Sequence, residues 1–257
     1  MRALKAILTG FVICMMVPQA SAWGLTGHRV VAKIAEENIS KETRQRIAEI
    51  LKNESMVMVS NYMDEMRSDS AYKLYKDWHW VTVPNGKTYA ETNKNPKGDL
   101  VFAIHYCKKI LLSDTSEQAK SIYLKFLIHL VGDLHQPLHV GNGLDAGGNS
   151  MKIKWFGSYS NLHSIWDSKM IDSKMWSYTE LAGNLQREFT ASEWIWRGTI
   201  ENWAEESIPY REQIYNFQGQ ANLGYDYLYH NWPLVKQQLW KGGIRLAKLL
   251  DEIFCKC

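Results

Sequence analysis

Apolar residues recur every three or four positions along most of this chain, a spacing that places them on one face of an α-helix. The pattern predicts seven helical segments, over residues 27–38, 41–52, 99–112, 117–134, 179–198, 200–216 and 234–254. Ser40 can cap the second segment, and Asp114-Thr115-Ser116 separates the third from the fourth. Pro233 lies where the first turn of the last segment is expected. We therefore expect an all-α fold.

Two stretches rich in glycine and asparagine interrupt the helical pattern. Pro84–Gly98 and Asn142–Asn149 are predicted to be surface loops. Asp77–Tyr89 and Met151–Phe156 are candidates for short extended segments, and a short hairpin is compatible with this pattern. The sequence contains neither a repeat nor a low-complexity linker. It therefore predicts a single mainly helical domain with two long loops.

The first 22 residues have the pattern of an export signal. Arg2 and Lys5 precede an apolar stretch from about Ala6 to Val17, and Ala20-Ser21-Ala22 matches the small-residue signature of a cleavage site. An uncut membrane anchor is the alternative, but the apolar run is too short for a stable span. We expect cleavage before residue 23, so that residues 23–257 form the exported domain.

The chain that remains after cleavage has 235 residues and a formal net charge of +1. This charge gives no bulk attraction for nucleic acid, so any attraction for phosphate must be local. Cys107, Cys255 and Cys257 remain, and one disulfide is compatible with an oxidising compartment. A link from the C-terminal Cys-x-Cys to Cys107 is one of the open pairings.

Two His-x-x-x-Asp pairs give the strongest chemical signal. His129 with Asp133, and His163 with Asp167, place an imidazole and a carboxylate on one helix face, and His139 follows the first pair closely. His129 and Asp133 interrupt an apolar, buried pattern, and burying them without partners is costly. A divalent cation would compensate for that cost. A metal-free, hydrogen-bonded His–Asp pair is the alternative.

Three motifs of this chain resemble the S1/P1 nuclease family. They are Trp23-Gly-Leu-Thr-Gly-His28, Phe126-Leu-Ile-His-Leu-Val-Gly-Asp-Leu-His-Gln-Pro-Leu-His139 and Asn161-Leu-His-Ser-Ile-Trp-Asp167. The resemblance spans nearly all of residues 23–257 and includes Gly147-Gly-Asn149 and 242–250. Members of this family are zinc-dependent nucleases and 3′-nucleotidases that prefer single strands, and they are related to zinc-dependent phospholipase C. The resemblance implies the mainly helical fold of these enzymes and three zinc ions.

The resemblance implies a residue of this chain at every ligand position of a trinuclear zinc cluster. The first zinc would be bound by Asp64, His79, His129 and Asp133. The second would be bound by His139, His163 and Asp167. The third would be bound by the amino nitrogen and carbonyl oxygen of Trp23, by His28 and by Asp133, which would bridge two ions. An α-amine loses its proton more readily than a lysine side chain, which favours Trp23 as a ligand once its amine is free.

The remaining three histidines are not implied to be ligands. His135 lies inside the longest motif, where a role in supporting the ligands is expected. His105 and His230 are expected to be ordinary helix histidines.

The resemblance also implies residues that contact the substrate. Arg67 would contact the phosphoryl oxygens in the transition state; a surface arginine is the alternative. Trp80 occupies the place of an aromatic base-stacking residue, with a purely packing role as the alternative. Asn149 is a candidate to hydrogen-bond a base edge or a ligand. Fungal and plant members often have an acidic residue where this chain has Thr82.

The function implied is that of an exported trinuclear-zinc phosphodiesterase. It would hydrolyse single-stranded DNA or RNA to 5′-nucleotides with zinc-activated water. Arg67, Asp64 and Asp133 would form its catalytic set. We also expect 3′-nucleotidase activity, a monomer and no stable membrane association. A phospholipase C-like zinc hydrolase and a non-enzymatic zinc-binding protein are the alternatives.

Overall fold

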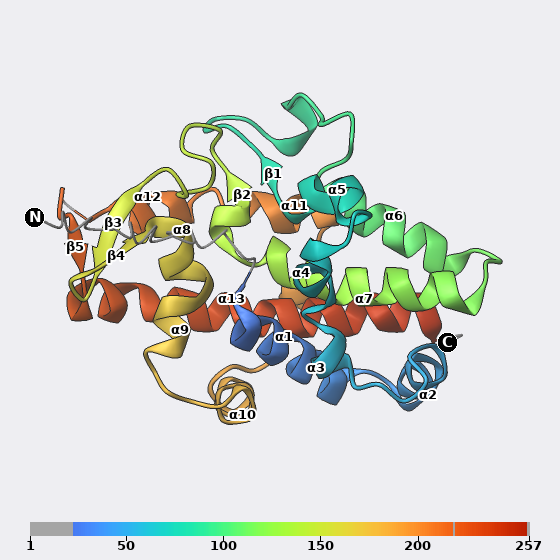
Figure 1. Ribbon diagram of the computed structural model, residues 1–257. Coiled ribbons are helices and arrows are strands. Elements are labelled where there is room, and N and C mark those ends of the chain that lie inside the picture. The colour runs from blue at the N-terminus through green and yellow to red at the C-terminus, as the bar shows by residue number, and fades with distance from the viewer. Residues whose placement is uncertain (1–22, 218, 256–257) are drawn as a thin grey trace, which may run out of the picture.

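The computed structural model describes residues 23–217 and 219–255, and the predicted export signal, residues 1–22, lies outside this part. The described chain is built mainly from helices, which confirms the predicted fold class (Figure 1). The longest helix, α13 (Tyr225–Phe254), extends along the molecule, and α1 (Leu25–Asn38) and α7 (Glu117–Leu134) pack against it. Within the described residues, none of the helices has the length and apolar character that a membrane span requires.

The other helical elements are shorter. The α-helices are α2 (Lys41–Ile50), α3 (Met56–Val59), α4 (Tyr62–Glu65), α5 (Tyr72–Tyr75), α6 (Leu100–Leu112), α8 (Leu162–Ser164), α9 (Met170–Asp172), α10 (Tyr178–Glu188), α11 (Ile200–Glu205) and α12 (Tyr210–Tyr215). Short 3₁₀ segments are η1 (Met66–Ser68), η2 (Lys76–His79), η3 (Tyr89–Glu91), η4 (Pro137–His139) and η6 (Glu193–Trp196). A π-helical segment, η5 (Ile165–Lys169), connects α8 to α9.

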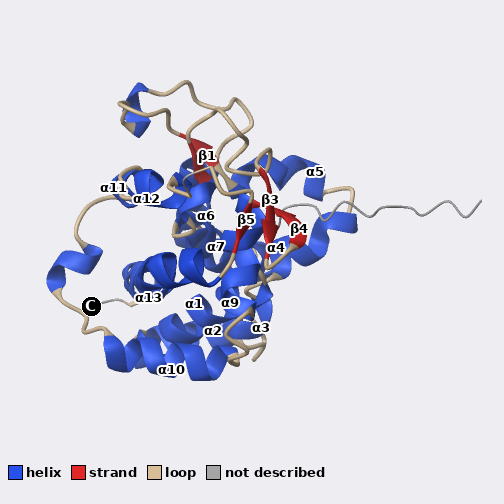
Figure 2. Ribbon diagram, turned by 90° about the vertical axis from the view of Figure 1, so that its left-hand side faces the viewer, coloured by secondary structure: helices blue, strands red, loops and turns tan. Residues whose placement is uncertain are grey.

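The strands are few and short beside the helices (Figure 2). β3 (Lys152–Trp155) and β4 (Ser158–Asn161) form an antiparallel hairpin, and β5 (Asn222–Leu223) pairs in parallel with β3. The two residues of the hairpin turn, Phe156 and Gly157, both have positive φ, of 45° and 82°, which suits the right-handed twist of the strands. β1 (Val81–Thr82) pairs in parallel with β2 (Val140–Gly141). A short hairpin was expected, and the structure contains one.

The first four predicted helices correspond to α1, α2, α6 and α7. The predicted start signals act as helix caps. Ser40 Oγ accepts a hydrogen bond from the Thr43 N–H at 3.1 Å, and Ser116 Oγ accepts one from the Ala119 N–H at 3.2 Å. These side chains satisfy backbone donors that have no partner within the first turn of a helix.

The start of the last helix was predicted wrongly. α13 begins at Tyr225, and Pro233 lies inside it rather than in its first turn. Tertiary hydrogen bonds hold the additional turns: the Tyr227 hydroxyl accepts from the Trp166 indole at 2.8 Å and donates to the Ile214 carbonyl at 2.7 Å. Contacts between distant segments therefore outweigh the helix-breaking tendency of a proline.

Two other predicted helices are shorter than expected. The segment 179–198 forms α10 only as far as Glu188, and the segment 200–216 is divided into α11 and α12. Pro209 lies at this division, directly before α12, and offers no N–H for a helical hydrogen bond.

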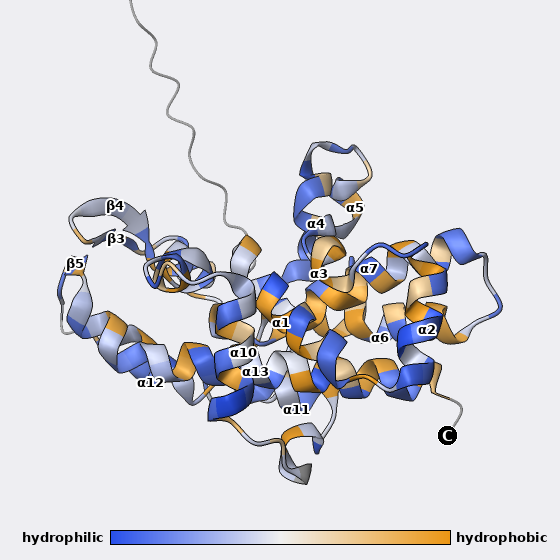
Figure 3. Ribbon diagram, turned by 90° about the horizontal axis from the view of Figure 1, so that it is seen from below, coloured by the Kyte–Doolittle hydropathy of each residue, from blue (hydrophilic) through white to orange (hydrophobic). Residues whose placement is uncertain are grey.

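The core lies where α1, α7 and α13 pack against one another. Val30, Val31 and Ile34 of α1 are fully buried, as is Leu130 of α7. Hydrophobic and hydrophilic segments alternate along the helices, as amphipathic packing requires (Figure 3). This arrangement fixes the positions of α1 and α7, which both carry candidate ligands.

The proposed link between the C-terminal cysteines and Cys107 is wrong. Cys107 is a buried free thiol on α6, whereas Cys255 is disulfide-bonded. The core packing of α6 fully encloses the Cys107 side chain.

Candidate metal centre

Seven helical elements bring the eight candidate His and Asp side chains together in the interior. α1 carries His28, α4 carries Asp64, η2 and η4 end in His79 and His139, and α7 carries His129 and Asp133; the segment from α8 into η5 carries His163 and Asp167. All eight are buried, with exposed fractions of at most 9%. Buried groups of this kind need partners, because burial without them costs several kcal/mol.

These side chains form three groups that could each hold a metal ion. In each group the potential ligand atoms lie within 4.8 Å of one another, and the groups are His28–Asp64–His129, His79–His129–Asp133 and His139–His163–Asp167. The last group comprises the three residues that were predicted to bind the second zinc. The four residues predicted for the first zinc belong to the other two groups, which share His129.

Asp133 lies between two of these groups. Its Oδ1 is 3.3 Å from His28 Nε2, while its Oδ2 is 3.0 Å from His79 Nδ1 and 3.4 Å from His129 Nε2. One oxygen therefore faces α1 and the other faces η2 and α7. This arrangement suits a carboxylate that bridges two ions.

Backbone carbonyls orient three of the imidazole rings. His129 Nδ1 donates to the Ser60 carbonyl at 2.8 Å, and His139 Nδ1 donates to the His79 carbonyl at 2.5 Å. His163 Nδ1 donates to the Gly147 carbonyl at 2.6 Å. Because a carbonyl only accepts, each bond places the proton on Nδ1 and leaves the Nε2 lone pair available for a metal.

The second His-x-x-x-Asp pair does not lie on a regular α-helix. It extends from α8 into the π-helical η5, where His163 Nε2 is still 3.1 Å from Asp167 Oδ2. π-Helical turns often occur at functional sites. Gln136 holds the other carboxylate oxygen, since its side-chain amide donates a hydrogen bond to Asp167 Oδ1.

Several polar atoms of the centre have no hydrogen-bond partner among the described residues. They are His28 Nε2, His79 Nε2, Asp133 Oδ1, His139 Nε2 and Asp167 Oδ2. Buried polar atoms in folded proteins nearly always have partners, so such a concentration requires an explanation. Nitrogen and carboxylate oxygen atoms are the donors that zinc accepts, and the residues present therefore fit a metal.

Except at His139, the protonation states of these groups also suit metal binding. Burial lowers the pKa of His28 to about 4 and lowers that of His79, so both rings are neutral at pH 7. Burial alone would raise the pKa of Asp133, but His129 and His139 hold it well below its usual range. Burial alone would lower the pKa of His139, but the carboxylates of Asp133 and Asp167 raise it to about 9. A cation would compete with that proton for the same negative charge.

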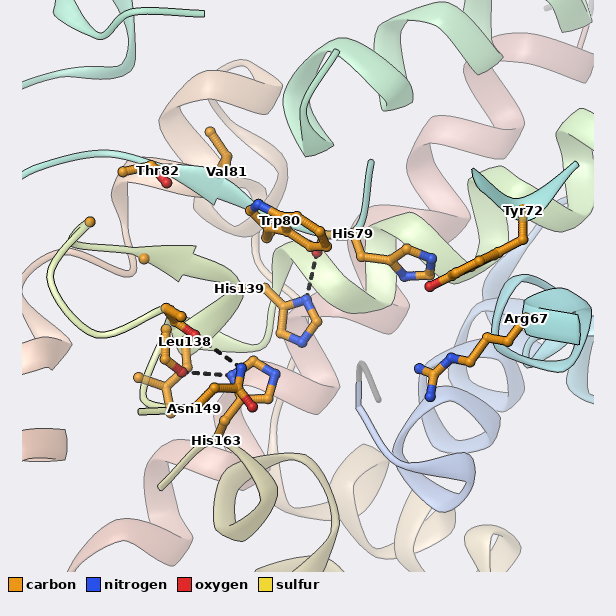
Figure 4. Close-up of a pocket in the computed structure, with 14 residues that line it drawn as sticks. Arg67, Tyr72, His79, Trp80, Val81, Thr82, Leu138, His139, Asn149 and His163 are labelled. Atoms are coloured by element: carbon orange, nitrogen blue, oxygen red, sulfur yellow. Dashed lines mark hydrogen bonds between the residues drawn. The ribbon is translucent and has the colours of Figure 1, made fainter. Parts of the chain in front are cut away.

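A cavity of about 440 Å³ opens beside this centre. His79, His139 and His163 contribute to its lining, and Figure 4 shows Trp80 beside His139 and Asn149 beside His163. The 40% exposed Trp80 side chain is accessible to a ligand. The predicted substrate residues therefore lie next to the predicted metal ligands.

Arg67 and Tyr72 line the opposite side of the same cavity (Figure 4). The Arg67 guanidinium donates to Asp64 Oδ1 at 2.5 Å, which places a fixed positive charge beside a candidate ligand. Arg67 is thus not an isolated surface arginine. Sequence reasoning did not identify Tyr72 because it has no motif of its own.

The second predicted loop forms part of the cavity wall, through Gly143, Ala146, Gly147 and Asn149. Thr82, at the end of β1, lines the cavity with an uncharged side chain. Gly147 is required there: its φ is +61°, and a Cβ would lie 2.4 Å from the Leu138 carbonyl oxygen. Asn149 donates its side-chain amide to the Ala146 carbonyl at 2.9 Å.

Trp23 lies just before α1, close to the group formed by His139, His163 and Asp167. Its side chain is fully buried, and the N–H of the next residue, Gly24, donates to the Asp167 carbonyl at 2.7 Å. A Cβ at Gly24 would lie only 2.1 Å from Ser168 Oγ. The backbone at Trp23 is therefore held tightly against η5.

The histidines predicted not to be ligands lie outside the three groups. His105 and His230 are exposed on α6 and α13. His135 is buried, but it donates to the Val131 carbonyl at 2.8 Å and accepts from Arg245 at 3.1 Å. The expected support of a metal ligand by His135 is therefore wrong; its contacts join α7 to α13. The residue that holds a ligand is its neighbour, Gln136.

The fold and the site together define a mainly helical protein with a candidate multi-metal centre beside an open cavity. A sequence model described as S1/P1 Nuclease matches residues 23–255, and the chain belongs to this family. It is 30% identical to Endonuclease 3 of Arabidopsis thaliana, over 96% of this chain and 94% of that protein. It is 27% identical to Nuclease P1 of Penicillium citrinum, over 90% of this chain and 97% of that protein. The predicted resemblance is confirmed, and the chain is a nuclease of the hydrolase class.

Proposed function

We propose that this protein is a trinuclear-zinc nuclease that hydrolyses single-stranded DNA or RNA to 5′-nucleotides and also acts as a 3′-nucleotidase. One observation carries the proposal: three buried groups of histidine and aspartate adjoin a cavity that is also lined by an arginine and an exposed tryptophan. A closed, purely structural zinc protein would not need such a cavity. Nor would it need an arginine beside a ligand.

The proposed ligand sets follow the family resemblance. Asp64, His79, His129 and Asp133 would hold the first zinc, and His139, His163 and Asp167 the second. The Trp23 amine and carbonyl, His28 and Asp133 would hold the third. The distances from Asp133 to His28, His79 and His129 support its bridging role.

The bound metal ions and the protein side chains would have different roles in the reaction. When bound, clustered zinc ions lower the pKa of water and neutralise phosphate charge. Arg67 would donate hydrogen bonds to the phosphoryl oxygens as negative charge develops on them. Asp64 holds the Arg67 guanidinium and so sets its direction. Asp133 would fix the spacing between the ions.

Substrate selection would depend on Trp80. A base can stack on an aromatic face whatever its identity, but only when it is unpaired, which favours single strands. Asn149 would hydrogen-bond the base edge from the opposite wall. Thr82 leaves this part of the cavity uncharged. We propose that residues 1–22 direct export, and that residues 23–257 act as a monomeric domain without stable membrane association.

The decisive experiment combines metal analysis with product identification. Protein beginning at Trp23 should contain three equivalents of zinc and release 5′-nucleotides from single-stranded DNA and RNA. Duplex DNA should react more slowly, and 3′-mononucleotides should lose phosphate. Release of phosphocholine from phospholipid without nucleotide release would replace the proposal with a phospholipase function. Zinc without either activity would indicate a non-enzymatic protein.

A further inference from the structure

Gly132 occupies an unfavourable position for a glycine. It lies in the last turns of α7, directly before Asp133, and its backbone is helical rather than left-handed. Glycine is less favourable than alanine inside a helix because it loses more backbone freedom on folding. The backbone conformation at this position does not require glycine, so its presence needs a packing explanation.

The His28 ring fills the space that a side chain at position 132 would need. A Cβ on Gly132 would lie 2.7 Å from His28 Nδ1 and 3.0 Å from His28 Cε1. The third nearest atom, at 3.8 Å, also belongs to this ring. The steric demand at position 132 therefore comes mainly from His28.

The ring has little freedom to move away. It stacks on the His129 ring, with centroids 3.9 Å apart and planes inclined by 15°, and its Nε2 is 3.3 Å from Asp133 Oδ1. α1 cannot easily retreat toward α13, because a second glycine contact limits that side. A Cβ at Gly243 would lie 2.5 Å from the Ile34 Cβ. Glycines thus permit close approach on both sides of α1.

We propose that Gly132 is a positioning residue of the metal centre: the absence of a side chain there allows His28 to approach Asp133 and complete one metal site. This inference rests on the proposed function, since it assumes that His28 binds a metal. In this proposal Gly132 contacts neither metal nor substrate. It acts only because its missing side chain leaves room for the His28 ring.

The test uses Gly132→Ala in protein that begins at Trp23. The added methyl group should displace the His28 ring and weaken the binding of one of the three zinc equivalents by about 10- to 100-fold. His28→Ala should have the same effect. Zinc content and competition with a chromophoric chelator measure this effect without reference to activity. Gly183→Ala in α10 is the matched control, because its Cβ would meet only Arg187 Nη1, at 3.6 Å. It should leave all three equivalents unchanged.

The double variant His28→Ala/Gly132→Ala separates positioning from a general structural role. Without the imidazole, the added methyl group meets no obstacle, so the double variant should match His28→Ala in zinc content and in melting temperature under chelation. Additive losses would overturn the proposal, because they would show that Gly132 acts through other contacts. This comparison also holds if Gly132→Ala alone folds poorly.

The outcomes also separate the inference from the proposed function. If His28→Ala loses a zinc equivalent and Gly132→Ala keeps all three at unchanged affinity, the inference fails while the proposed centre stands. If His28→Ala loses none, the proposed third site fails, and the inference fails with it.

Discussion

Gln136 and Asp167 are joined by a hydrogen bond between two segments of the metal centre. The side-chain amide of Gln136 donates to Asp167 Oδ1, and its carbonyl oxygen accepts from the Leu138 N–H at 2.6 Å. The second bond fixes which end of the amide faces the carboxylate. Asp167 Oδ2, which has no hydrogen-bond partner among the described residues, then remains on the side of His163. Gln136 therefore orients a candidate ligand without being one.

Replacing Gln136 should weaken one metal site. In Gln136→Leu the carboxylate of Asp167 loses its donor, and we expect about 10- to 100-fold weaker binding of one zinc equivalent. Competition with a chelator of known affinity measures the change. Gln238→Leu is the control, because it removes another buried glutamine, from α13. Equal zinc affinity in the Gln136 variant and the wild type would contradict this role.

Arg67 should act on the rate rather than on substrate binding. Arg67→Ala removes donors that are most useful when charge develops on the phosphoryl oxygens, so kcat should fall by about 10²- to 10³-fold. KM should change much less. Steady-state kinetics on a single-stranded oligonucleotide provide the measurement, and Arg46→Ala, on the surface of α2, is the control. If Arg67→Ala lost zinc to the same extent as it lost activity, Arg67 would instead act only by holding the ligand Asp64.

Trp80 should contribute to the binding of unpaired bases. Stacking on an aromatic ring is worth about 1–3 kcal/mol per base, so Trp80→Ala should raise KM for single strands roughly 5- to 150-fold. Trp80→Phe should retain most of the affinity. Trp176→Ala is a suitable control, since Trp176 is 43% exposed against 40% for Trp80. A purely packing role would instead lower the melting temperature and leave KM unchanged.

The sequence predicted most of the metal centre because its main signals are local. Residues four apart, such as His129 and Asp133, reveal a common helix face through their spacing alone. The hydrogen bond from Gln136 joins residues that are 31 positions apart. The contact between Gly132 and His28 is likewise made between two helices. No periodicity carries such information, so these residues emerge only from the packing.

The fold was predicted where local signals dominate and missed where tertiary contacts do. Ser40 and Ser116 mark helix starts through bonds to residues three positions later. Pro233 suggested a helix start, but the bonds of Tyr227 to Trp166 and Ile214 extend the helix beyond it. A proline restricts only its local backbone, and packing decides whether the helix continues.

Glu206 should stabilise the fold in a pH-dependent manner. Its carboxylate accepts from Arg245 at 2.5 Å and from Lys241 at 3.1 Å, and both cations are buried. Burial alone would raise the pKa of Glu206, but these two cations hold it below its ordinary value of 4.5. Glu206→Gln should therefore lower the free energy of unfolding at pH 7 by about 1–3 kcal/mol.

The sign of the pH dependence follows from the lowered pKa of Glu206. The Glu206 carboxylate stabilises the fold fully above its ordinary pKa. This stabilisation is lost as the pH falls through the pKa that Glu206 has in the folded state. The difference in the free energy of unfolding between wild type and Glu206→Gln should thus become smaller below about pH 4. Urea unfolding with chelator present gives the measurement, and Glu252→Gln, at an exposed ion pair, is the control. A difference that does not vary with pH would exclude this electrostatic origin.

The position of Trp23 leads to a prediction about processing. The hydrogen bond from the Gly24 N–H to the Asp167 carbonyl holds the start of α1 beside the group formed by His139, His163 and Asp167. A free α-amine at Trp23 can donate its lone pair to zinc, whereas a peptide nitrogen at the same place cannot readily do so. Protein with two extra residues before Trp23 should therefore bind one zinc equivalent more weakly and have lower activity. The same two residues added after Cys257 should have no effect. Proteolytic removal of the N-terminal extension should restore the third equivalent, and full zinc content with the extension in place would exclude the amine as a ligand.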